Sequence, residues 1–76
     1  MSEKFRPLPI RKVRRALERL GFVFRWQTGS HLNYRRGSKT VSIPNHREVA
    51  PGTLRKALKE AEVSMEEFME AYRKRK

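Results

Sequence analysis

The sequence predicts one small α+β domain in which helices cover one face of a three-stranded antiparallel sheet. Two observations predict it: apolar residues recur at helical spacing near both ends of the chain, and they alternate with polar residues between positions 22 and 43. The chain has 76 residues, too few for a second independent core. We therefore expect a single domain over residues 1–76, with its core at about 9–72 and a basic tail at 73–76.

The first predicted helix begins at Pro9 and ends before Gly21. Proline fits the first turn of a helix, and glycine is the usual residue just after the last turn. Between them an apolar stripe lies opposite a basic face. The stripe is Ile10, Val13, Ala16, Leu17 and Leu20, and the basic face is Arg11, Lys12, Arg15 and Arg19.

Three strands are expected next, at residues 22–27, 31–36 and 39–43, with turns at Gly29 and Gly37. Alternation in the first strand favours the core for Phe24 and Trp26, although exposed aromatic rings there would be platforms for stacking unpaired bases. The face of the sheet opposite the helices is expected to be open to water. It would display Arg25, His31, Asn33, Arg35, Thr40 and Ser42.

The second half of the chain should return to helix. Residues 44–50 are expected to form a loop, and Pro51 to open a second helix. Ser64 and Glu67 match a capping box, which predicts a short third helix. The expected order is therefore α-β-β-β-α with a short extra C-terminal helix.

The charge balance indicates the kind of partner. The chain carries a net charge of +11, and such a basic body attracts polyanions, so nucleic acid is the leading partner. The carboxylates before position 60 are only Glu3, Glu18 and Glu48, and there is no cysteine, which leaves too few ligands for a two-metal phosphodiesterase or a thiolate site. We expect a soluble cytoplasmic protein without membrane span, metal or other cofactor.

His31 lies among cations on the predicted open face, a setting that suits RNA cleavage without a metal. RNA supplies its own nucleophile, the 2′-OH, and a neutral imidazole can remove its proton near neutral pH. Arginine and lysine can stabilise the phosphorane that forms. The plainer interpretation is that His31 only begins a strand after a turn.

Several short motifs resemble the HicA (YcfA-like) toxin family over about residues 9–70. They fall in the family's order and spacing, and they are the segments Leu20–Phe22, Gly29–His31 with Tyr34, Pro44–His46, Pro51–Leu54 and Glu66–Phe68.

This resemblance implies a double-stranded-RNA-binding-like fold and an mRNA-cleaving toxin (an mRNA interferase) that a HicB-type antitoxin holds inactive. It implies that His31 is the catalytic histidine, for which general-base chemistry is the natural role, and that Gly29 and Ser30 shape the turn that presents it. The chain departs from many relatives at Leu32, where they carry a second histidine or a basic residue, and in its shorter turn at Gly37.

Two interpretations remain open for His46 and for the basic side chains. His46 is either a second acid–base group or a residue whose hydrogen bond stabilises its loop. The basic side chains are either a solvated surface or contacts to RNA phosphates. The set selected for RNA is Lys12, Arg11, Arg15, Arg25, Arg35 and Lys56. The rival to an endoribonuclease is a double-stranded-RNA-binding or regulatory module that cleaves nothing.

Overall fold

The structure, a computed structural model, describes residues 6–74, so Arg75 and Lys76 of the predicted basic tail lie outside the described residues. Within residues 6–74 no helix is long and apolar enough to cross a membrane. The α-β-β-β-α order with a further C-terminal helix is confirmed. The elements are β1 (Leu8–Pro9), α1 (Ile10–Arg19), β2 (Val23–Thr28), β3 (His31–Arg36), β4 (Lys39–Pro44), β5 (Glu48–Val49), α2 (Pro51–Glu60) and α3 (Met65–Arg73).

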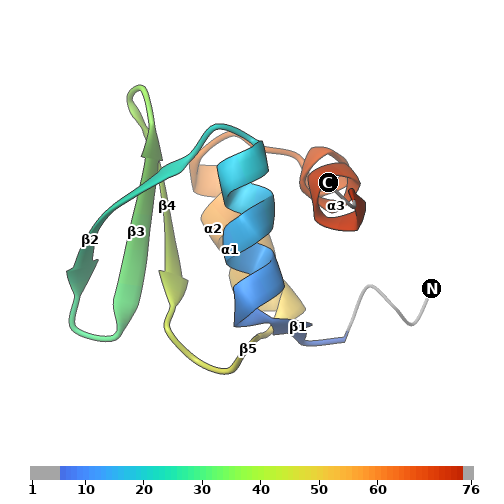
Figure 1. Ribbon diagram of the computed structural model, residues 1–76, viewed down its shortest axis with the longest axis horizontal. Helices are drawn as coiled ribbons and strands as arrows, with labels where there is room; N and C mark the ends of the chain where they lie inside the picture. Colours follow the sequence, from blue (N-terminus) through green and yellow to red (C-terminus); the bar gives the residue numbers. More distant parts are fainter. Residues whose placement is uncertain (1–5, 75–76) are drawn as a thin grey trace.

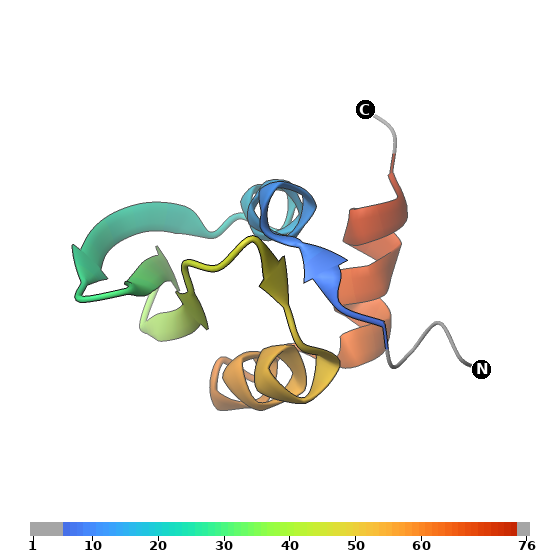
Figure 2. The ribbon, with the colours of Figure 1, turned by 90° about the horizontal axis from the view of Figure 1, so that it is seen from below.

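The main sheet is antiparallel and has the strand order β2-β3-β4. Helices α1 and α2 lie on the same side of it, and α3 lies beside α1, away from the strands (Figure 1). Seen from below, β2 curves outward beyond the helices (Figure 2). The expected arrangement, with one face covered by helices and the other open among the described residues, is therefore confirmed.

The predicted loop at residues 44–50 contains a strand that the sequence did not indicate. β5 pairs with β1 in a second, two-stranded sheet, where Leu8 faces Val49. The pairing continues into α1, since the backbone N–H of Ile10 donates to the carbonyl oxygen of Arg47 at 2.9 Å. Two-residue strands are too short to show a hydrophobic period, so only the tertiary structure reveals this sheet.

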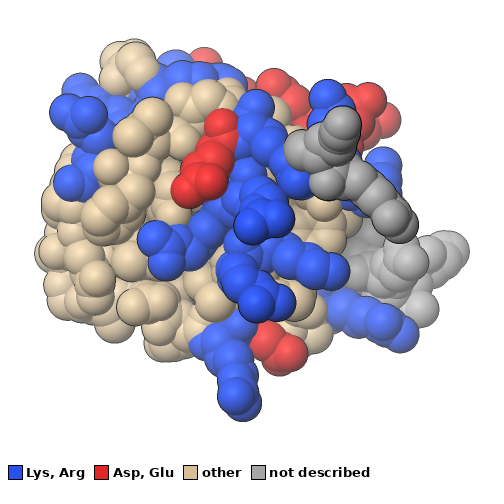
Figure 3. All heavy atoms as spheres, in the orientation of Figure 1, with Lys and Arg blue, Asp and Glu red and all other residues tan. Residues whose placement is uncertain are grey.

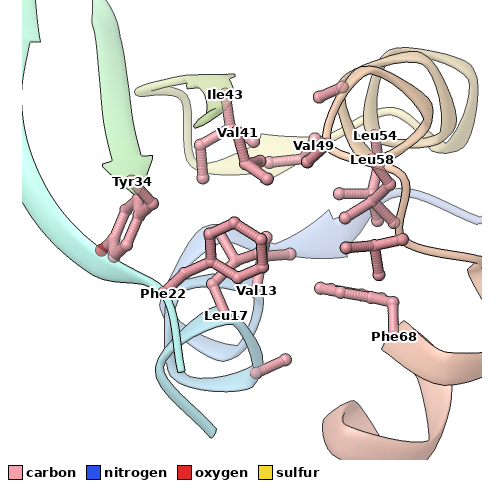
Figure 4. Packing of buried hydrophobic residues seen from close by; sticks show 14 of the residues in the cluster. Val13, Leu17, Phe22, Tyr34, Val41, Ile43, Val49, Leu54, Leu58 and Phe68 are labelled. Carbon is pink, nitrogen blue, oxygen red and sulfur yellow. The ribbon is translucent and has the colours of Figure 1, made fainter. Parts of the chain in front are cut away.

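The core fills the space between the sheet and the three helices (Figure 4). Burying one large apolar side chain, such as leucine, valine or phenylalanine, contributes about 1.5–3 kcal/mol to the free energy of folding. Tyr34 is fully buried and its hydroxyl accepts a 2.6 Å hydrogen bond from Nε of Arg14, so its polar end is satisfied. The other labelled core residues are Val13, Leu17, Phe22, Val41, Ile43, Val49, Leu54, Leu58 and Phe68.

The predicted helix ends are confirmed by their hydrogen bonds. Gly21 has a φ of +95°, and the N–H of Phe22 donates to the carbonyl of Leu17, which closes the end of α1 as a Schellman motif does. At the start of α3, Oγ of Ser64 accepts from the N–H of Glu67 at 3.0 Å. Helix α1 starts one residue later than predicted, with Pro9 immediately before it.

A β-bulge in β2 overturns the prediction that Phe24 and Trp26 lie in the core. Phe24 pairs with Tyr34 but Trp26 pairs with Asn33, so the register shifts at Arg25. Paired residues share a face, so the extra residue leaves Phe24 on the helix side and brings Trp26 to the open face. Phe24 is 41% exposed and Trp26 43%, because β2 extends beyond the helices.

Candidate functional site

His31 lies at one end of the main sheet, where it is exposed to solvent. It is the first residue of β3 and pairs with Thr28 of β2 on one side and with Pro44 of β4 on the other. The tight turn at Gly29 brings the chain back into β3, and its φ of +58° is one that glycine adopts without strain. The turn therefore presents His31 on the central strand at the rim of the open face.

The structure brings the Gly29–His31 and Pro44–His46 segments together. The N–H of Asn45 donates to the carbonyl oxygen of Ser30 at 2.6 Å, directly beside the pairing of His31 with Pro44. Both segments lie at the same, lower end of the sheet in Figure 1. The sequence left the distance between the two histidines open, and this contact places the loop that carries His46 next to the strand end that carries His31.

Arg47 belongs to the same end of the sheet, and the sequence analysis did not single it out. It is exposed, and its backbone carbonyl accepts from Ile10 at the start of α1. The loop at residues 45–47 thus joins the His31 end of the sheet to the beginning of the basic helix. The only sequence signal was its position immediately after His46.

Asn33 was expected to display its side chain on the open face, and the structure corrects this. Its register does place it on that face, but it is only 6% exposed. Its Nδ2 donates to the carbonyl oxygen of Trp26 and to Oγ1 of Thr28, both at 3.3 Å, and more weakly to the carbonyl oxygen of His31 at 3.5 Å. Asn33 is therefore a tie between β2 and β3, and an alternation pattern cannot distinguish such a tie from a displayed amide.

Arg25 and Arg35 lie towards the opposite end of the sheet. Both line a shallow depression with Val23 and Gly37, and Nε of Arg35 donates to the carbonyl oxygen of Gly37 at 2.9 Å. Four residues along one strand span about 13 Å, so Arg35 is far from His31 on the same face. These two cations therefore form a group separate from His31, towards the other end of the sheet.

The predicted basic face of α1 forms a band of Lys and Arg across one side of the molecule (Figure 3). Arg11, Lys12 and Arg15 are exposed, and Lys12 and Arg15 also line a groove that α1 shares with the end of α3. Arg19 was expected in this face, but it is half-buried and its guanidinium donates to the carbonyl oxygen of Ala71 in α3 at 3.0 Å. It therefore holds two helices together.

Two further cations have structural roles. Arg14 bonds the Tyr34 hydroxyl and lies 5.9 Å from the centre of the Phe24 ring, and Arg36 lies 4.6 Å from the centre of the Phe22 ring. In the α1–α3 groove, burial raises the pKa of the Tyr72 phenol above its ordinary value.

Lys56 is exposed on α2, one of the helices that cover the sheet, and is therefore separated from the open face. Among residues 6–74 the only ion pair joins Lys39 to Glu62 at 2.9 Å. No three His, Asp or Glu side chains in this described part of the chain gather as metal ligands would.

Comparison with protein families gives a match over most of the chain. The family model described as "HicA toxin of bacterial toxin-antitoxin" matches residues 10–63, from the start of α1 to just beyond α2. The match includes the turn before His31 and the loop that carries His46. Comparison with curated proteins and with solved structures gives no significant match.

Proposed function

The chain belongs to the HicA toxin family of bacterial toxin–antitoxin systems, and from this premise we propose that it is a metal-independent endoribonuclease that cleaves mRNA, with His31 as general base. The observation that carries the proposal is the meeting of the two histidine-bearing segments through the Asn45–Ser30 hydrogen bond. An exposed imidazole at the rim of an open sheet is accessible to a bound strand. Gly29 and Ser30 supply the turn that holds it there.

The reaction needs no group beyond those of the protein, the RNA and water. His31 takes the proton of a 2′-OH, the 2′-oxygen bonds to the adjacent phosphorus, and the bond from phosphorus to the 5′-oxygen breaks. The products are a 2′,3′-cyclic phosphate and a 5′-hydroxyl, whose proton comes from a general acid or water. His46 is the candidate acid, because its loop lies against the His31 turn.

Cations around this end attract and hold the RNA backbone. Arg11, Lys12 and Arg15 extend from it along α1, while Arg25 and Arg35 lie towards the other end of the open face. Arg25 and Arg35 suit phosphate contacts to a strand on the open face, whereas Arg11, Lys12 and Arg15, on a helix that covers the other face, suit contacts to backbone that passes around the His31 end. Such contacts add affinity without reading sequence. Lys56, on α2, is assigned to a more distant backbone contact.

The test compares wild type, His31→Ala and His46→Ala on a defined RNA in EDTA, with products resolved on a gel. His31→Ala should lose about 10²- to 10⁴-fold in cleavage rate, the usual contribution of a positioned acid or base, while still binding a strand whose 2′-OH groups are replaced by hydrogen. Full cleavage by His31→Ala would refute its role as the base. His46→Ala should show a comparable loss if it is the acid and none if its role is confined to the loop.

The alternative function is a double-stranded-RNA-binding or regulatory module without cleavage. The exposed band on α1 favours it, because in double-stranded-RNA-binding folds the first helix meets the minor groove. A gel shift by wild type and His31→Ala alike, with intact RNA in both lanes, would support this alternative.

A HicB-type antitoxin is the proposed partner. An acidic protein lying over the open face would neutralise the cations and cover His31 together. Added in equal amount, such a protein should stop RNA cleavage, and raising the salt concentration should weaken its inhibition. Inhibition that leaves His31 accessible to a histidine-modifying reagent would contradict this placement.

A further inference from the structure

Trp26 is an exposed tryptophan on the same face as His31, and the core does not require it there. It is 43% exposed, although a residue of this type usually buries most of its ring. The bulge at Arg25 is what brings it to the open face, since strict alternation from Phe24 through Arg25 would point its ring to the helix side. The fold thus places a large aromatic ring in water on one face of an edge strand.

The register gives the position of Trp26 relative to His31. His31 pairs with Thr28, so Trp26, two residues earlier on β2, is its diagonal neighbour on the open face, about 7–8 Å away. The amide of Asn33 bonds the backbone of Trp26, the hydroxyl of Thr28 and the backbone of His31. The backbone positions of Trp26 and His31 are therefore held on one piece of sheet, at a spacing comparable to the step between neighbouring nucleotides.

We propose that Trp26 stacks on an unpaired base next to the bond that His31 cleaves, so that the substrate at this site is single-stranded RNA. The proposal rests on the function proposed above. Base–aromatic stacking accepts every base and is worth about 1–3 kcal/mol per base. A paired base keeps its faces within the duplex, so a duplex cannot offer one to the ring without first unpairing.

The surroundings of Trp26 fit a nucleic-acid strand. Arg25, immediately before it, and Arg35 line a depression towards one end of the sheet, while His31 and the loop with Arg47 lie at the other end. A strand lying along the open face would meet cations on both sides of one aromatic ring. A charged groove with an aromatic platform is the usual arrangement of proteins that bind single strands.

Trp26 is the only tryptophan in the chain, which makes its fluorescence a direct probe. A strand carrying 2′-deoxy groups, which cannot be cleaved, should quench this fluorescence on binding, and the same strand annealed to its complement should quench it far less. The variant Trp26→Ala should bind the single strand about five- to a hundred-and-fifty-fold more weakly, and Trp26→Phe should recover most of the affinity. Unchanged affinity in Trp26→Ala, or equal quenching by duplex and single strand, would overturn the proposal.

The matched control is Phe24→Leu. Phe24 is exposed to the same degree on the same strand, but it pairs with Tyr34 on the helix side. This variant should bind and cleave single-stranded RNA as wild type does. If Phe24→Leu loses as much affinity for the single strand as Trp26→Ala, then the affinity depends on the general order of β2, and the stacking role of Trp26 is refuted.

A coupling experiment identifies the stacked base. One abasic position is moved along a cleavable RNA, and cleavage is measured with wild type and Trp26→Ala. One abasic position beside the cut should slow wild type strongly and Trp26→Ala hardly at all, because the stack is already missing. If the losses in cleavage rate caused by the abasic position and by Trp26→Ala add at every position tested, the contact is refuted.

These results distinguish failure of the inference from failure of the proposed function. If wild type cleaves no RNA, yet single strands quench Trp26 selectively, the endoribonuclease is wrong and the stacking surface stands. If wild type cleaves RNA and Trp26→Ala is indistinguishable from it, stacking is wrong and the ring is left to a protein partner such as the antitoxin.

Discussion

Strands β2 and β4 flank the same central strand and have six residues each, but their surroundings differ completely. In β4, Val41 and Ile43 are fully buried beneath the helices, whereas every residue of β2 is exposed. Both strands pair only with β3, but β2 curves beyond α1 and α2, so its side chains are free to meet a ligand (Figure 2). β4 thus contributes buried apolar side chains to the stability of the fold, whereas β2 contributes side chains exposed to solvent.

The difference also shows what stabilises an overhanging strand. Three contacts hold β2. The side chain of Asn33 bonds its backbone, the Phe24 ring meets the Tyr34 ring edge-on with 5.7 Å between the ring centres, and Arg14 lies over both rings. These are polar and aromatic contacts, each of modest strength. β4 depends on apolar burial, which is stronger and less specific in geometry.

The sharpest test of this comparison is the pair Ile43→Ala and Val23→Ala. Ile43 is fully buried and Val23 is 56% exposed. Ile43→Ala should lower the free energy of unfolding by about 2–5 kcal/mol, whereas Val23→Ala should change it by no more than about 0.5 kcal/mol. Urea unfolding followed by circular dichroism measures both. Losses of equal size would mean that β2 contributes to the core as β4 does.

Asn33→Ala should have the next largest effect, because it removes the tie between β2 and β3. We expect a loss of about 1–3 kcal/mol as partly buried backbone groups lose their donor. Hydrogen exchange of the β2 amides should accelerate while that of the β4 amides does not. Ser42→Ala is the control, since Ser42 in β4 is the pairing partner of Asn33 in β3. Unchanged protection of β2 in Asn33→Ala would show that the ladder alone holds the strand.

Gly29→Ala tests the turn through which β2 reaches β3. A Cβ there meets no atom within 4 Å, so the cost is the positive φ itself, about 1–2 kcal/mol. Gly52 in the first turn of α2 has equally open space, and Gly52→Ala should leave stability unchanged or raise it by up to about 1 kcal/mol. The melting temperature of Gly29→Ala should therefore fall, whereas that of Gly52→Ala should stay the same or rise. A loss in both would point to a cause other than φ.

The smallest effect is expected from Lys39→Ala at the start of β4. Its 2.9 Å ion pair with Glu62 joins two partly exposed side chains, and such pairs contribute about 0.2–1 kcal/mol. High salt should remove the difference between wild type and variant in the same urea experiment. A difference that persists in high salt would show that Lys39 stabilises β4 by contacts other than charge.

Much of the fold could be predicted because its signals are local. Helical spacing identified the stripes that α1 and α2 bury, Gly21 marked the end of α1, and Ser64 with Glu67 marked the start of α3. Each depends on residues within one or two turns of one another, which is the range over which periodicity and capping act.

The site was predicted less completely. The sequence placed His31 at the start of a strand on the open face, and the structure agrees. It did not place the loop of His46 and Arg47 beside that residue, and it put the ring of Trp26 on the wrong face. Both depend on contacts between segments distant in the sequence: the Asn45–Ser30 hydrogen bond and a bulge that is defined only against β3.

Local chemistry in the chain was therefore sufficient for the order of the three helices and the three main strands, for the helix ends to within a residue or so, for the buried stripe of each helix and for the excess of positive charge. Tertiary structure alone decided which strand is covered, which face each side chain of β2 occupies and which loop adjoins His31. The physical reason is the distance along the chain over which each effect acts. Propensity, capping and charge act through near neighbours or through simple sums, whereas register and coverage depend on how whole elements pack, and one inserted residue in β2 is enough to move Trp26 from the helix side to the open face.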